Sequence, residues 1–102
     1  MISIDTLETM STENVDYRMT PEQCRAGRAL LDLSQPQLAE AAGLGLSTVV
    51  DFERSRRQVS AEAISLIARA LKIAGVDFID ENGGGAGVRL SKGRSKTIRK
   101  GG

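Results

Sequence analysis

Two short helix patterns joined by a glycine turn, within residues 34–57, constrain the fold of this chain more than any other feature. Ser34 is a good N-cap for a predicted helix over 35–42, and a glutamine three residues after it completes a capping box. Gly43 follows that helix at the position where the backbone usually turns left-handed. A second helix is predicted over 46–54. The segment therefore predicts two helices packed across a tight turn.

Further helix patterns flank this pair. Thr20 caps a predicted helix over 21–31 that begins with proline, and Ser60 caps another over 61–73. Apolar residues recur at helical spacing in these segments, which gives the helices faces suited to a shared core. The residues expected to face that core are Leu38, Ala39, Ala42, Val49, Phe52, Ile64, Ile67, Ala68 and Leu71.

The pattern changes after Gly75. Two short segments rich in β-formers, 76–79 and 88–90, are separated by a glycine-rich loop, and this predicts a small hairpin. We therefore expect an all-α fold of four to five short helices with a small C-terminal β-hairpin. The expected organisation is a flexible tail over 1–18, a helical domain over 19–75, a hairpin extension over 76–91 available for dimerisation, and a disordered basic tail over 92–102.

Composition argues against an enzyme or a metal centre. The chain has no histidine and a single cysteine, Cys24, so it lacks the commonest general base and the usual zinc ligands. We expect Cys24 to be a small core residue, and we expect no cofactor and no metal. No apolar run approaches the roughly 20 residues that cross a bilayer, and no secretory pattern opens the chain. A cytoplasmic location without membrane contact is expected.

Charge is distributed unevenly along the chain, although the formal net charge is only +1. Residues 1–18 carry four acidic groups against one arginine, and residues 76–102 carry six basic groups against three acidic ones. A small net charge is weak support for nucleic-acid binding, so the position of the arginines matters more than their number. Three arginines close the second helix pattern. Complementing a helix dipole explains one of them better than three, which favours phosphate contact.

Three elements occur in a characteristic order: Arg28, then LSQPQLAEAAGL at 33–44, then STVVDFERSRR at 47–57. Residues 19–75, a little over half of the chain, resemble the Cro/repressor-type helix-turn-helix family, also called the xenobiotic-response-element or lambda-repressor-like type. No tripeptide among them is specific, but the ordered set is fairly specific. The continuation over 75–85 resembles an extension found in small bacterial members of the family.

The resemblance implies a role for each matching position. The positions that would face base edges in DNA are Leu46, Ser47, Val50 and Asp51. The positions that would hold backbone phosphates are Gln35, Thr48, Arg54, Arg56 and Arg57. Arg28 and Glu53 would form a structural ion pair between the first and third helices.

Three positions depart from the family pattern. Leu46 stands where a long polar side chain is common, Asp51 would repel nearby phosphates, and Ser55 stands where glycine is usual. Leucine and valine can contact a thymine methyl, and aspartate can accept a hydrogen bond from cytosine N4. The departures therefore bear on base preference rather than on the fold.

These features together predict a sequence-specific DNA-binding transcriptional regulator, a repressor, with the 46–54 helix in the major groove of double-stranded DNA. A homodimer on a palindromic operator is expected, because one domain of this size buries little DNA surface. The alternative is a protein-interaction module of the same fold, an antitoxin or an antagonist of another regulator. In that interpretation the Leu46–Val50 surface grips a protein partner.

Overall fold

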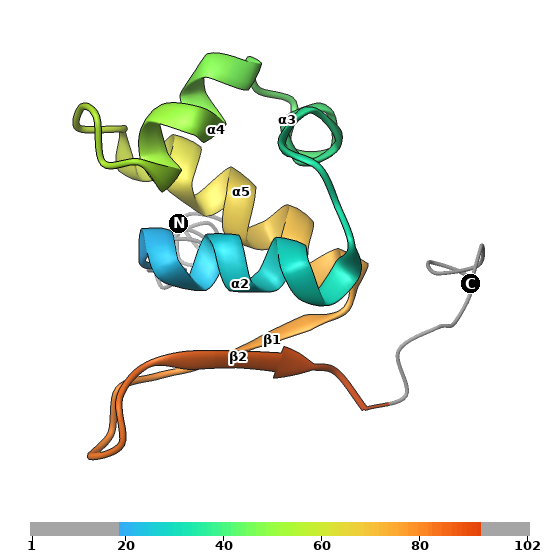
Figure 1. Ribbon diagram of the computed structural model, residues 1–102, viewed down its shortest axis with the longest axis vertical. Helices are drawn as coiled ribbons and strands as arrows, with labels where there is room; N and C mark the ends of the chain where they lie inside the picture. Colours follow the sequence, from blue (N-terminus) through green and yellow to red (C-terminus); the bar gives the residue numbers. More distant parts are fainter. Residues whose placement is uncertain (1–18, 93–102) are drawn as a thin grey trace, which may run out of the picture.

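Four helices and a two-stranded hairpin follow one another along residues 19–92, the part of the chain that this computed structural model describes (Figure 1). The elements are α2 Pro21–Leu31, α3 Gln35–Ala42, α4 Leu46–Glu53, α5 Ala61–Ala74, β1 Val76–Ile79 and β2 Gly87–Leu90. The mainly helical fold with a C-terminal hairpin is the one that the sequence predicts. The tail expected over 1–18, and all but the first residue of the tail expected over 92–102, lie outside the described residues.

Local capping chemistry explains where the helices begin and end. Thr20 and Ser34 each accept a hydrogen bond from the backbone three residues on, and a glutamine side chain at that position accepts one in return. Ser60 caps α5 by accepting a hydrogen bond from the backbone N–H of the third helical residue. Gly43 and Gly75 end α3 and α5 in the left-handed region, with φ of 73° and 119°.

Three predicted boundaries are wrong by one residue. α4 ends at Glu53, because Arg54 takes φ −101° and ψ 4° and so leaves the helical conformation. α5 continues to Ala74, since helical hydrogen bonding extends to the glycine cap. β2 begins at Gly87, which pairs with Ile79 across the hairpin.

The core lies where the four helices meet, with α5 running behind and between α2 and α4 (Figure 1). Buried apolar side chains come from every helix and from β1. They are Met19, Cys24, Leu31, Leu38, Ala39, Val49, Phe52, Val59, Ala63, Ile67, Ala68, Leu71 and Val76. Ala42 and Ile64, which the sequence places in the core, are half-buried and pack against its edge.

The Gln23 side chain joins the hairpin to the helices. β1 and β2 pair antiparallel, with Val76 opposite Leu90 and Ile79 opposite Gly87. The Gln23 amide donates to the carbonyl oxygen of Gly87 at 2.9 Å and to that of Ile79 at 3.4 Å, and the residue is only 6% exposed. The hairpin lies along α2 on the side away from α3 and α4, so it leaves the face of α3 and α4 uncovered (Figure 1).

Replacing Gly27 with alanine is expected to raise the free energy of unfolding by about 0.5–1 kcal/mol, because glycine is unfavourable inside a helix. The added Cβ would lie 3.5 Å from a methyl group of Leu71 and 3.7 Å from one of Val76, which are ordinary contacts. Denaturant titration measures the change. Gly75→Ala, at a φ of 119°, is the control and should destabilise the protein. A loss of stability at Gly27 would mean that α2 packs more tightly than these distances allow.

Candidate nucleic-acid interface

Helix α4 presents two faces of opposite character. Val49 and Phe52 are buried beneath it and anchor it to the core. The opposite side, which we call the α4 outer face, carries the four residues expected to face DNA bases: Leu46, Ser47, Val50 and Asp51. Leu46 is 45% exposed, Ser47 is exposed, and Val50 and Asp51 are half-buried. The helix is thus held from one side and left open on the other.

The N-terminal end of α4 also has free backbone donors. Gly45 is its N-cap, and no side chain caps the first turn. The half-buried Thr48 donates its backbone N–H to the Gly45 carbonyl oxygen at 3.1 Å. Uncapped N–H groups at a helix start are suited to an anion such as a phosphate.

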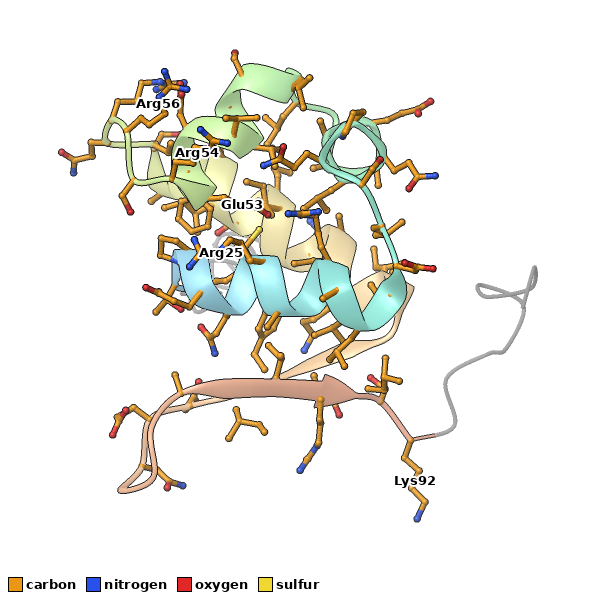
Figure 2. The ribbon with its side chains drawn as sticks, in the orientation of Figure 1. Arg25, Glu53, Arg54, Arg56 and Lys92 are labelled. Carbon is orange, nitrogen blue, oxygen red and sulfur yellow. The ribbon has the colours of Figure 1, made fainter. Side chains whose placement is uncertain are left out.

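The chain reverses direction after α4, and this turn brings the arginines that follow the helix back beside it. Ser55 has a φ of 53°, and the Arg56 N–H donates to the Asp51 carbonyl oxygen at 2.9 Å. A left-handed conformation costs a non-glycine residue about 1–2 kcal/mol, so this turn is strained. Figure 2 shows Arg54 and Arg56 at this end of α4, on the side of the molecule where Arg25 also lies. Lys92 lies at the far end of the protein (Figure 2).

The Asp51 carboxylate forms ion pairs with the neighbouring arginines. Its carboxylate accepts a hydrogen bond from the Arg57 Nε at 2.7 Å, and it lies 3.9 Å from the Arg56 Nε. Both arginine side chains are more than half exposed, so the pairs add little to stability. Their main effect is to hold Arg57 against the α4 outer face.

Beneath this surface, Glu53 is the centre of a buried hydrogen-bond network. Arg28 donates to both carboxylate oxygens, from Nε at 2.8 Å and from an Nη at 2.9 Å. Gln35 donates its amide at 2.9 Å, and the Cys24 thiol donates at 3.0 Å. Glu53 is 1% exposed, so these donors replace water entirely. The network joins α2, the start of α3 and the end of α4.

The network sets the protonation of its members. Burial pushes the pKa of Glu53 upward, but the hydrogen bonds from Arg28, Cys24 and Gln35 outweigh it and hold that pKa below its usual value. The hydrogen bond to Glu53 raises the pKa of Arg28 further. Burial, followed by the bond to Glu53, raises the pKa of the Cys24 thiol, so Cys24 stays neutral and acts as a donor.

Glu53 is therefore expected to contribute to the acid unfolding of the protein. Because its pKa is lowered by folding, its stabilising effect is complete above the pKa of an unfolded glutamate, about 4.3, and is lost as the pH falls through the lower folded pKa. Urea unfolding at a series of pH values measures this slope. Glu53→Gln should flatten the acid limb relative to the wild type, whereas Glu62→Gln, at an exposed site on α5, should leave it unchanged. Equal slopes in the wild type and Glu53→Gln would contradict the expectation.

An open pocket of about 640 Å³ lies beside the network, between α2, the start of α3 and the end of α4. Gln35, Arg54 and Arg25 line it, and the guanidinium of Arg25 donates to the Glu53 carbonyl oxygen. Gln35 and Arg54 therefore lie on the lining of the same pocket. The Gln35 amide is directed to Glu53 and helps to fix the helix ends.

A comparison with family models identifies the family of this chain. A model described as Helix-turn-helix matches residues 25–78, more than half of the sequence. The chain belongs to the Cro/C1-type helix-turn-helix family. A search of curated proteins finds no match. Proteins of this family are DNA-binding regulators, and this helix-turn-helix chain is accordingly a DNA-binding regulator.

Two members of the site in this helix-turn-helix protein carry no signal in the sequence. Arg25 belongs to no motif of its own, although it lies three residues before Arg28 and so on a neighbouring part of the α2 surface. The sequence predicts only that Cys24 fills space, and the structure adds a hydrogen bond to Glu53.

Within residues 19–92, no helix has the length and hydropathy that crossing a membrane requires.

Proposed function

We propose that this protein is a sequence-specific transcriptional repressor that places α4 in the major groove of its operator. The base edges then face Leu46, Ser47, Val50 and Asp51. Backbone phosphates lie near Gln35 and Thr48 on one side and near the arginines that follow α4 on the other. Occupying a promoter in this way blocks transcription directly.

The single observation that carries this proposal is the α4 outer face. Leu46 and Ser47 on this face are exposed, and the arginines that follow α4 lie at its end. An α-helix of this size fits the major groove of B-DNA. Positive charge beside the helix supplies the sequence-independent part of the affinity.

Dimerisation through the hairpin is part of the proposal. A two-stranded hairpin has two open edges, and an open edge can pair with a strand of a second copy. Ile79 and Leu90, large apolar residues at opposite ends of the hairpin, are 38% and 39% exposed. Two copies would bind half-sites about 34 Å apart, one turn of DNA.

Sedimentation tests the dimer. The wild type is expected to have the mass of two chains, and replacing both Ile79 and Leu90 with lysine is expected to give the mass of one. Deleting the hairpin is a poorer test, because Val76 is fully buried and its loss would damage the core. A wild type with the mass of one chain at every concentration would contradict dimerisation.

Selection of bound sequences from a random pool of double-stranded DNA tests the function itself. A repressor of this kind should enrich a palindrome and bind it more tightly than unrelated DNA by a factor of at least about 1,000. Arg56→Ala should weaken binding to all sequences and lower the slope of log affinity against log salt by about one. Arg69→Ala removes the same charge from α5 and should change neither quantity. Recovery of no motif would contradict sequence-specific binding.

A protein-binding role of the same surface has one observation in its favour. Leu46 and Val50 place two apolar side chains together on the α4 outer face, and Leu46 is 45% exposed. Weak binding to all DNA that disappears at modest salt, without an enriched motif, would favour an antitoxin or an antagonist of another regulator.

A further inference from the structure

The α4 outer face is short of hydrogen-bond donors. Leu46 and Val50 are apolar, Asp51 can only accept, and Ser47 has a short hydroxyl that can reach one atom at most. Guanine presents two acceptors in the major groove, O6 and N7, and a forked donor recognises them best. The residues on α4 itself provide no such fork.

The chain reversal after α4 brings a forked donor to this face. Ser55 adopts the left-handed conformation, the backbone closes from Arg56 onto Asp51, and the Arg57 side chain then returns to the helix. The Arg57 Nε donates to the Asp51 Oδ2 at 2.7 Å. Arg57 reaches the outer face from six residues further along the chain, and its side chain remains 52% exposed.

The hydrogen bond to Asp51 uses only part of the guanidinium. An arginine has five N–H donors, and the bond to Asp51 engages the one on Nε. The two terminal nitrogens remain as a planar pair of donors. That pair matches O6 and N7 of one guanine.

We propose that Arg57, oriented by Asp51, is a base-reading residue that recognises a guanine in the operator. The inference rests on the proposed function and deepens it, since family resemblance groups Arg57 with the phosphate contacts. Asp51 is then a positioning residue: it fixes the guanidinium and does not itself bind a base. Arg56, which lies 3.9 Å from Asp51 and is more exposed, keeps the phosphate role and provides a matched control.

Selection from the random DNA pool with full-length variants tests the proposal. The wild type should enrich a motif with one fixed guanine in each half-site. Arg57→Ala should reduce the preference for guanine at that position by roughly 5- to 100-fold and leave the other positions unchanged. Arg57→Lys keeps the charge but not the fork, and it should lose most of the same preference. Arg56→Ala should weaken binding evenly and keep the whole motif.

Variants of Asp51 separate positioning from general structure. Asp51→Ala should relax the same single position while raising affinity for unrelated DNA, because a negative charge is removed. Asp51→Asn keeps an oxygen that can accept from the Arg57 Nε, so it should restore most of the guanine preference. Melting temperatures of all variants, expected to be close to that of the wild type at these surface sites, identify any variant that misfolds.

Two results would overturn the inference in distinguishable ways. If Arg57→Ala lowers affinity evenly, reduces the salt slope by about one and leaves the guanine preference intact, Arg57 is a phosphate contact and the proposed function stands. If the wild type enriches no motif at all, the proposed function and the inference fail together.

Discussion

Replacing Arg28 with alanine is expected to lower the free energy of unfolding by about 3–5 kcal/mol, because the change leaves a buried carboxylate without its cation. Glu53 is 1% exposed, and only the neutral donors Gln35 and Cys24 would remain. Glu53 would then bind a proton more readily. The stability of Arg28→Ala should therefore rise as the pH falls from neutrality towards about 5, a range over which the contribution of Glu53 to the wild type does not change. Urea unfolding followed by circular dichroism measures both effects.

Replacing the other member of the ion pair, Glu53, should lower the free energy of unfolding by less. Removing the Glu53 carboxylate leaves Arg28, whose side chain is 20% exposed and can turn towards water, so Glu53→Gln should cost less than Arg28→Ala. Replacing both members of the pair with apolar residues, as Arg28→Met combined with Glu53→Leu, should recover much of the lost stability. An unchanged melting temperature in Arg28→Ala would show that the ion pair has no structural role.

Leu71→Ala is expected to cost about 2–5 kcal/mol, the range for a leucine removed from a rigid core. Leu71 is completely buried on α5, and its methyl groups face Gly27 on α2. Glycine has no side chain that can move into the space, so the cavity should persist. Because domains of this size are only marginally stable, the variant should be close to unfolding at room temperature.

A residue two positions further along provides the control for this substitution. Ile73 is 77% exposed, so Ile73→Ala should change the free energy of unfolding by less than about 0.5 kcal/mol. Both substitutions remove apolar atoms from α5, and both introduce alanine, which favours a helix. Similar losses at the two positions would contradict the packing of α5 against α2.

Local chemistry makes the helices predictable from sequence. Each N-cap side chain accepts a hydrogen bond from a backbone N–H three residues further on, as Thr20, Ser34 and Ser60 do. Glycine adopts a left-handed turn at little cost, as Gly43 does at the end of α3. Such effects do not depend on the rest of the molecule. The one-residue errors lie at the ends of α4 and α5 and at the start of β2, where the backbone conformation or pairing of a single residue decides how far the element continues.

The contacts that shape the site are less predictable, because they join residues distant in the chain. The sequence places Gln23 in a capping box, yet its side chain also bonds to a carbonyl oxygen 64 positions away. Family resemblance alone implies the Arg28–Glu53 pair. Nothing in the spacing of Asp51 and Arg57 indicates a hydrogen bond, since that bond depends on the left-handed backbone of Ser55. Exposed charged side chains of this kind find their partners only after the fold has formed.

The burial of Cys24 allows local opening of the protein to be measured by thiol labelling. It is the only thiol in the sequence, it has no exposed surface, and its raised pKa suppresses the reactive thiolate. A thiol-specific dye can therefore label the chain only during transient opening of α2. Labelling kinetics, with and without DNA, would follow how a bound duplex slows that opening, without any engineered probe.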